Sequence, residues 1–496
     1  MTVPGRRAMP GAVPGTTPGA IGATWPPRPS PSRLAGLTGS RARLALIGLL
    51  LGTMALAVAA PGVARPLFIL GSAGVGYLAW REGCGRSIEV AVSLYVFAPF
   101  LRRLVDVGVG FDPSGVMLVG PVLAIAIPTV ELRHLLLSRE KEDEALLPFL
   151  LVGVCITYGM LLSAFSDDLS TLATAALKIY TPLLYGAWVA RSARNDPAVL
   201  DAATNVFLVL TPIIGVYGIW QYVSPSDWDR YWMLSVSGTI SVLGRPEPYQ
   251  VRVFSMMNSP ASFGTYAACG VLLFGFCRRG WQSLPLALLV APGLLFTYYR
   301  TAWISLVLGV FYCALFSRTR ERAGLIAVVI VVATILAAGS TEFGDAIVER
   351  LSTFTGSISD DGSGRARLDQ LFAIYKLVDG MGVGLGYARL SAPFNGVDAA
   401  DGEVVTAIIA MGVLVGSLYL VGLVWAGVQA LGRIRASADP RLIVTGAVII
   451  GMLAAIPLTG VTSGEIGLLF WTFIALATAQ PAGGRRGTAP HDRAGP

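Results

Sequence analysis

Fourteen windows of mostly apolar residues, separated by short polar stretches, follow one another along the chain from Leu44. Most of them have about 17 to 25 residues, the length that a helix needs to cross roughly 30 Å of hydrocarbon. The pattern therefore predicts an all-α fold, a polytopic transmembrane helix bundle of about 14 spans. The predicted spans are 44–60, 63–80, 87–101, 114–130, 146–166, 171–189, 199–223, 258–277, 281–298, 300–317, 323–339, 404–428, 442–459 and 462–479.

The polar stretches divide the chain into tails, a membrane body and loops. Residues 1–43 are rich in proline and arginine and hold no acidic residue, so we expect a disordered cytoplasmic tail. The first apolar window begins too late for a signal peptide, and we expect this tail to be retained. Residues 44–479 form the predicted transmembrane body, with long outer loops at 224–257 and 340–403, and residues 480–496 form a second cytoplasmic tail.

Composition supports a membrane protein and removes several other classes. Hydrophobic residues make up 54% of the chain and charged residues only 14%, whereas soluble domains have about 25% charged residues. The net charge of +7 does not indicate nucleic-acid binding, because the basic residues are distributed between apolar windows. With the N-terminus inside, clusters such as Arg278-Arg279 and Arg433 to Arg435 fall on one side, which the positive-inside rule assigns to the cytoplasm. The protein is then predicted to lie in the cytoplasmic membrane, with both termini on the cytoplasmic side.

The residue types that are missing narrow the possible chemistry. The chain has two histidines, His134 and His491, and both fall on the predicted cytoplasmic side. The sequence contains no P-loop, no H-E-x-x-H and no G-x-S-x-G motif, which argues against an ATPase, a metalloprotease or an α/β-hydrolase. We therefore predict no metal and no cofactor.

Arginines near the predicted outer surface are the main candidates for substrate contact: Arg252, Arg300, Arg365 and Arg367. A guanidinium matches phosphate oxygens in a bidentate geometry and stays charged in a partly dry site. Arg300 occupies a tight connection between two apolar windows, where the alternative is an interfacial arginine that reaches the lipid headgroups. Lys178 falls inside a predicted span, where an ionisable group is either functional or reaches toward the interface.

Several ordered stretches resemble a known family. They are residues 252–260 before a helix, the turn 296–303, the segment 362–365 with the amphipathic stretch after it, the glycine-rich run 382–386, and residues 411–416 in a later helix. In this order and on the outer side, they resemble the O-antigen polymerase and ligase superfamily. The similar region covers roughly a third of the chain.

The resemblance implies a GT-C-like glycosyltransferase that acts on polyprenyl-diphosphate-linked glycans at the outer face of the membrane, without nucleotide sugar or metal. Arg252, Arg300 and Arg365 match family arginines that are thought to hold the donor diphosphate. Arg300 and Arg365 are predicted to be catalytic. Arg252 is predicted to bind the substrate together with Arg367, Lys178 and Asn258. The expected partners are the lipid-linked glycan and membrane lipid, with a chain-length regulator and a flippase as further candidates and no nucleic acid.

The acidic residues before the span at 404–428 bear on the type of enzyme. Ligases of the family have a histidine there, whereas this chain has Asp398, Asp401 and Glu403, which favours a polymerase. Each carboxylate is a candidate general base, and each could instead be a helix-start residue near the positive end of the helix dipole. Two other functions stay open: a transporter or flippase of lipid-linked glycans, and a ligase that joins a finished glycan to lipid or protein.

Overall fold

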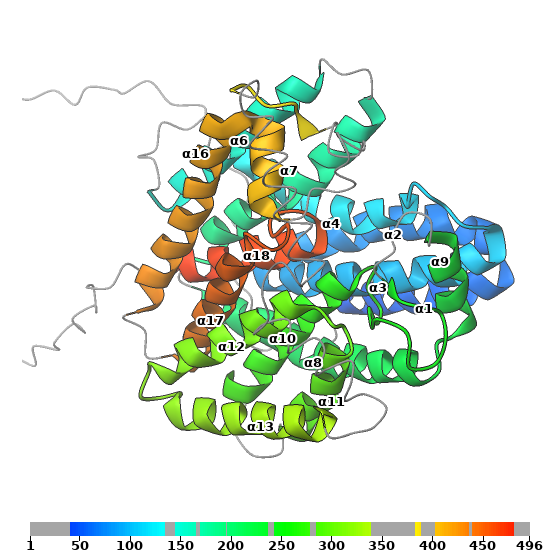
Figure 1. Ribbon diagram of the computed structural model, residues 1–496. Coiled ribbons are helices and arrows are strands. Elements are labelled where there is room, and N and C mark those ends of the chain that lie inside the picture. Colours follow the sequence, from blue (N-terminus) through cyan, green and yellow to red (C-terminus); the bar gives the residue numbers. More distant parts are fainter. Residues whose placement is uncertain are drawn as a thin grey trace, which may run out of the picture. The chain divides into compact units, whose positions relative to one another are not determined.

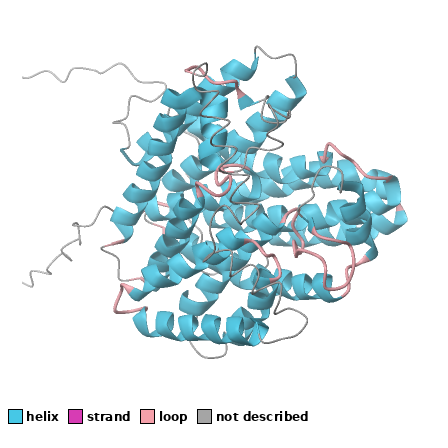
Figure 2. Cartoon of the chain, in the orientation of Figure 1, coloured by secondary structure: helices cyan, strands magenta, loops and turns pink. Residues whose placement is uncertain are grey.

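The computed structural model describes most of the chain, and the regular secondary structure of the described parts is helical. The described residues are 40–133, 144–164, 169–194, 196–236, 243–277, 284–338, 382–387, 402–435 and 439–480. Within these ranges no β-strand forms, and an isolated bridge pairs Gly244 with Val251 (Figure 2). The chain separates into residues 1–40 and 41–496, and every named helix belongs to the second unit. Nearly all of both predicted tails and most of the loop 340–403 lie outside the described residues.

A helix lies over each of the fourteen predicted spans (Figure 1). One further helix, α9 (Asp227–Val236), lies within the first predicted outer loop. The other α-helices are α1 (Arg41–Ala59), α2 (Pro61–Glu82), α3 (Cys84–Val109), α4 (Val119–Thr129), α6 (Leu147–Ala164), α7 (Leu169–Ser192), α8 (Pro197–Val223), α10 (Pro260–Cys277), α11 (Leu284–Leu295), α12 (Arg300–Ala314), α13 (Arg320–Ala338), α16 (Glu403–Ile434), α17 (Pro440–Ala455) and α18 (Gly464–Thr478). Short 3-10 turns flank α4 and precede α6.

The outward surfaces of these helices are compatible with a membrane protein. Five described segments are helical, long and apolar enough to cross a membrane: 41–59, 61–82, 144–164, 197–223 and 403–434. Large apolar side chains such as Leu51, Val58 and Phe311 are exposed on helices, where contact with water would be unfavourable. The all-helical class is thus confirmed, while the count of fourteen spans, the GT-C-like arrangement and the orientation stay predictions.

Ion pairs join the first three helices near their ends. Arg43 Nη2 at the start of α1 lies 2.7 Å from Glu89 Oε1 near the start of α3. Arg65 Nη2 near the start of α2 lies 2.6 Å from Asp106 Oδ1 near the end of α3. These pairs connect α3 to α1 at one of its ends and to α2 at the other.

Small residues let neighbouring helices approach closely. Helices α12 and α17 pack against each other, and Ser305 Oγ of α12 donates to the carbonyl oxygen of Gly451 in α17 at 2.8 Å. A Cβ atom at Gly451 would lie 2.8 Å from the carbonyl oxygen of Ser305. Glycine is therefore required at this crossing, as is common where packing rather than water drives helix association.

Helix α16 is interrupted one third of the way along its length. Gly412 has φ +77° and ψ 172°, which are not helical values, so the carbonyl groups of the preceding turn lose their usual acceptor role within the helix. The glycine-rich segment 382–387 replaces the missing donors. Leu385 N–H donates to the Ile409 oxygen at 2.8 Å, and Gly386 N–H donates to the Ala410 oxygen at 2.9 Å.

This docking depends on glycine on both sides of the contact. Gly384 has φ +86°, and a Cβ atom there would lie 2.5 Å from the backbone nitrogen of Gly412. Tyr158 of α6 donates its hydroxyl to the Val383 oxygen at 2.7 Å and anchors the same segment from the other side. The glycine-rich run at 382–386 thus supplies backbone hydrogen bonds to the broken helix. The apolar pattern did not predict this contact.

We predict that Gly384→Ala destabilises the protein while Gly382→Ala does not. The Gly384 substitution combines a left-handed backbone with a backbone clash, and we expect a loss of at least about 2 kcal/mol in the free energy of unfolding. Gly382 is a matched control in the same segment, because no atom lies within 4 Å of a Cβ built there. Thermal unfolding of both variants in detergent measures the difference. Equal midpoints would contradict the role of the 382–387 segment in stabilising the break in α16.

Candidate functional site

The first predicted outer loop is folded onto the helix ends. After α9 in the sequence, Gly244 and Val251 form an antiparallel bridge, and Val253 N–H donates to the Phe296 oxygen at 3.0 Å. Val251, Val253 and Phe254 are fully buried. The loop therefore joins the helix bundle at the turn that leads into α12.

Arg252 is anchored at the turn that leads to Arg300. The Arg252 guanidinium donates to the carbonyl oxygens of Thr297 and Tyr298, each at 3.3 Å. Two residues after Tyr298, Arg300 begins α12 and is half-buried. The tertiary structure thus brings together two predicted phosphate-binding arginines that are 48 positions apart in the sequence.

Aromatic and hydroxyl contacts hold the turn in place. The rings of Tyr222 and Phe296 are stacked, with centroids 4.0 Å apart and an interplanar angle of 8°. The hydroxyls of Tyr222 and Tyr298 lie 3.3 Å apart, and Thr297 Oγ1 accepts from Tyr299 N–H at 3.0 Å. Tyr298 has a left-handed backbone (φ +50°), a strained conformation for a non-glycine residue that such contacts maintain.

Asn258 adds an open acceptor beside the same loop. It lies two residues before α10 and is half-buried. Its side-chain oxygen is buried and makes no hydrogen bond to any described residue. A buried amide oxygen without a donor is costly, so Asn258 is suited to accept a hydrogen bond from a ligand hydroxyl.

A buried ion pair lies beneath the loop. Arg103 Nη1 of α3 is 2.9 Å from Asp229 Oδ1 of α9, and both side chains are 0% exposed. Arg103 Nη2 also donates to the Ser255 oxygen at 2.7 Å, and its guanidinium lies 4.9 Å from the ring centroid of Phe254. Arg103 therefore connects α3, α9 and the loop at one point.

Neighbouring polar groups complete this network. Asp229 Oδ2 accepts from the Tyr217 hydroxyl at 2.8 Å and from Gln221 Nε2 at 3.0 Å. Gln221 Oε1 in turn accepts the backbone N–H groups of Phe254 and Ser255 at 3.0 and 2.8 Å. The side-chain nitrogen of Gln221 thus ties α8 to α9, and its side-chain oxygen ties α8 to the loop residues that follow Arg252.

Sequence reasoning missed the role of Arg103. The sequence placed Arg102 and Arg103 in a short outer connection, but α3 extends through both of them to Val109. Arg102 Nε lies 3.4 Å from Asp106 Oδ2, one helical turn onward. The Arg-Arg-x-x-Asp spacing was a usable signal for the Arg102–Asp106 pair, since residues four apart on a helix face each other, but it does not indicate the contact of Arg103 with Asp229 on α9.

Glu403 lies at the start of α16 and is almost completely buried, with 5% of its surface exposed. Its Oε1 accepts from the Tyr419 hydroxyl at 2.5 Å and from Thr462 Oγ1 at 2.8 Å, and its Oε2 accepts from Val461 N–H at 2.7 Å. These donors bind both carboxylate oxygens within the protein. The geometry favours the helix-start alternative for Glu403 over the role of general base.

Lys178 is exposed on α7, and Glu465 lies at the start of α18. Glu465 is an acidic residue that the sequence reasoning did not select, although it follows Thr-Ser-Gly within a predicted span. The remaining predicted site residues, Arg365, Arg367, Asp398 and Asp401, lie outside the described residues. Across the described ranges, no group of three His, Cys, Asp or Glu side chains is placed to hold a metal ion.

We predict that Arg103→Met strongly destabilises the protein by leaving the Asp229 carboxylate buried without its cation. Breaking one partner of such a pair costs about 3 to 5 kcal/mol. The double variant Arg103→Met with Asp229→Asn removes the uncompensated charge, and we expect it to recover part of that loss. Thermal unfolding of the single and double variants tests this, and a single variant as stable as the parent would contradict the network.

Comparison with known proteins assigns no family to the chain. No protein-family model matches it, and no curated protein matches it.

Proposed function

We propose that the protein is an integral membrane glycosyltransferase that polymerises polyprenyl-diphosphate-linked oligosaccharides at the outer face of the cytoplasmic membrane. Such an enzyme would act in O-antigen, capsule or exopolysaccharide biosynthesis. The observation that carries the proposal is the contact of Arg252 with the turn before Arg300, together with the Asn258 side-chain oxygen just after the loop, which accepts no hydrogen bond from the described residues. Positive charge and a hydroxyl-binding group are what a glycosyl diphosphate requires.

The chemistry follows from the bond that must break. An acceptor hydroxyl oxygen bonds to the anomeric carbon, and the bond between that carbon and the diphosphate oxygen breaks. The hydroxyl proton passes to a carboxylate, and the diphosphate leaves with the bonding electron pair. The arginines stabilise the charge that develops on the leaving group, and a positioned base contributes about 10²- to 10⁴-fold.

Within this proposal the two sets of acidic residues have different roles. Glu403 has its oxygens bound by Tyr419, Thr462 and Val461, so it holds the start of α16 against the segment before α18. Asp398 and Asp401 are the proposed bases. Arg365 and Arg367 would join Arg252 and Arg300 at the diphosphate, and Lys178 would contribute charge from α7.

A transporter or flippase of lipid-linked glycans is the second candidate, and one observation favours it. Helix α16 is broken at Gly412, and interrupted helices form the substrate sites of many transporters. The carbonyl groups at this break already bind the 382–387 segment, which reduces what they can offer to a substrate. A ligase that uses the same donor but another acceptor is the third candidate.

Arg300→Ala and Arg365→Ala are each expected to abolish polymer production while the protein still inserts. Loss of a charge-assisted contact to the leaving diphosphate removes stabilisation that is specific to the transition state. Arg245→Ala is the matched control, because Arg245 is an exposed arginine of the same outer loop as Arg252. Polymer length and yield are measured and normalised to the amount of membrane-inserted protein. Unchanged length and yield in both variants would contradict the catalytic role.

Glu403→Gln and Asp401→Asn are expected to differ in kind. The amide nitrogen that the Glu403→Gln substitution introduces would face hydroxyl or N–H donors, so we expect a loss of about 1 to 3 kcal/mol in stability with activity retained per folded molecule. The Asp401 variant should instead keep its stability and lose at least about 10²-fold in rate. Unfolding midpoints and single-turnover rates separate the two, and the opposite pattern would make Glu403 the base.

The decisive reaction uses the purified protein and a polyprenyl-diphosphate oligosaccharide in the absence of nucleotide and metal. Growth of longer lipid-linked chains supports the polymerase. Lipid movement across vesicles without elongation would support the flippase, and transfer to a lipid or protein acceptor without elongation would support the ligase.

A further inference from the structure

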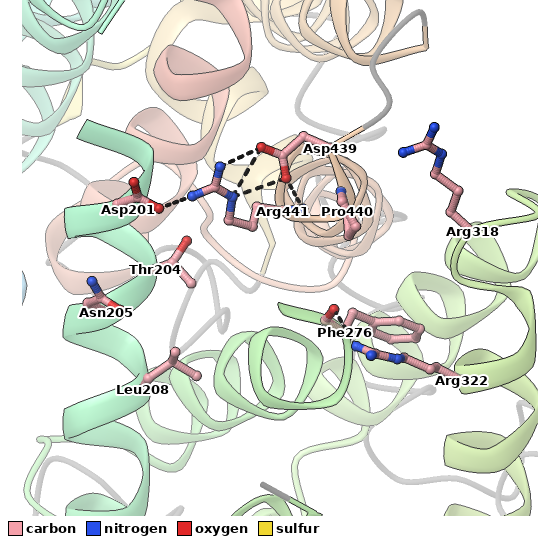
Figure 3. Close-up of a pocket in the computed structure, with 10 residues that line it drawn as sticks. All are labelled: Asp201, Thr204, Asn205, Leu208, Phe276, Arg318, Arg322, Asp439, Pro440 and Arg441. Carbon is pink, nitrogen blue, oxygen red and sulfur yellow. Dashed lines mark hydrogen bonds and ion pairs between the residues drawn. The ribbon is translucent and has the colours of Figure 1, made fainter. Parts of the chain in front are cut away.

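A pocket lies at the end of the bundle opposite the Arg252 and Arg300 turn in the predicted topology. It has a volume of about 620 Å³ and is bounded by the first turns of α8, the end of α10, the connection from α12 to α13, and the start of α17 (Figure 3). Its polar lining residues are Asp201, Thr204, Asn205, Arg318, Arg322, Asp439 and Arg441. None of them belongs to the site proposed above.

Both aspartates of this pocket contact Arg441. Asp439 caps α17 by accepting from Arg441 N–H at 2.9 Å, and its Oδ2 lies 2.7 Å from Arg441 Nη2. Asp201 contacts Nη1 of the same guanidinium. Arg441 is thereby fixed in orientation, and two acidic charges are gathered around it.

Arg318 and Arg322 give the pocket its positive charge. Arg322 Nη1 donates to the Phe276 oxygen at the end of α10 at 3.0 Å, which holds this half-buried side chain at the pocket wall. Figure 3 shows Arg318 and Arg322 reaching in from the α13 side, across from the Asp201 side of the pocket. The lining thus carries three guanidinium groups beside two carboxylates, and guanidinium groups match phosphate oxygens in geometry and charge.

Exposed apolar surface continues from the pocket along α8. Asp201 and Asn205 line the pocket and begin a face that continues through exposed apolar side chains at helical spacing. These side chains are Val209, Ile213, Val216 and Trp220. At 1.5 Å per residue, the face from Asn205 to Trp220 is about 22 Å long, roughly the length of an extended acyl chain.

A second exposed apolar stripe lies on α12, the helix that precedes the pocket residue Arg318. Val307, Phe311 and Leu315 are exposed at intervals of four residues, and Arg318 follows three residues later. A soluble phosphate or a nucleotide would use the charged pocket but neither apolar face. A phospholipid would use both kinds of surface at once, and basic pockets between helices on the cytoplasmic side are suited to anionic headgroups.

We infer that this pocket binds the phosphodiester headgroup of an anionic phospholipid, with its acyl chains along the exposed faces of α8 and α12. Arg318 and Arg322 contact the phosphate, and Arg441 with its two aspartates forms the opposite polar wall. The inference does not depend on the glycosyltransferase proposal, since it concerns different residues and a different ligand.

The test measures lipid retention by the full-length protein in detergent with native mass spectrometry. We expect the parent protein to retain phosphatidylglycerol in preference to phosphatidylcholine. Arg318→Gln should reduce bound phosphatidylglycerol about fivefold, and the Arg318→Gln, Arg322→Gln double variant more than about tenfold. Arg435→Gln is the matched control, because it removes the same charge from an exposed residue that does not line the pocket.

Each outcome decides the inference. Equal retention by the parent, the control and both variants would overturn it, as would equal retention of phosphatidylcholine. Inorganic phosphate that displaces the lipid at equal molar concentration would also overturn it, because the apolar faces would then add nothing. Arg318 is exposed, so its single variant keeps the test valid even if loss of the Arg322 contact with Phe276 affects folding.

Discussion

The structure depends on one constraint: backbone polar groups must be satisfied within surroundings that offer few other partners. Helices meet this requirement internally, which is why each long apolar window forms one. The break in α16 shows the same constraint where a helix fails. At Gly412 the carbonyl groups of Ile409 and Ala410 lose their helical donors, and the N–H groups of Leu385 and Gly386 replace them. The break persists because another backbone segment completes its hydrogen bonds.

Charged groups within the bundle follow a related rule, because an isolated buried charge is costly. Arg103 is fully buried, and it is balanced by Asp229 and by the Ser255 carbonyl. That pairing holds α9 and the 243–257 loop on the helix ends, which in turn brings Arg252 to the turn before Arg300. Structural arginines thus position the arginines that are proposed to act on substrate.

The two ends of the bundle use arginine differently. At the predicted outer end, Arg252 and Arg300 share a turn that aromatic stacking and a left-handed Tyr298 hold rigid. At the other end, Arg318 and Arg322 face a cavity next to exposed apolar helix faces. A diphosphate substrate at one end and a membrane phospholipid at the other would therefore be recognised by the same guanidinium chemistry in different settings.

The sequence by itself determined the helical class and the approximate place of the helices over the fourteen apolar windows, because the length and spacing of such windows depend only on local composition. It missed α9, whose residues are too polar to form such a window. It also selected Arg252, Arg300 and Asn258 as candidates, because their residue types suit contact with a phosphate or a hydroxyl group. Only the tertiary structure decided that Arg252 meets the Arg300 turn and that Glu403 is enclosed by donors from α16 and the segment before α18. These contacts join residues 16 to 58 positions apart, and their partners are set by how helices pack rather than by local pattern.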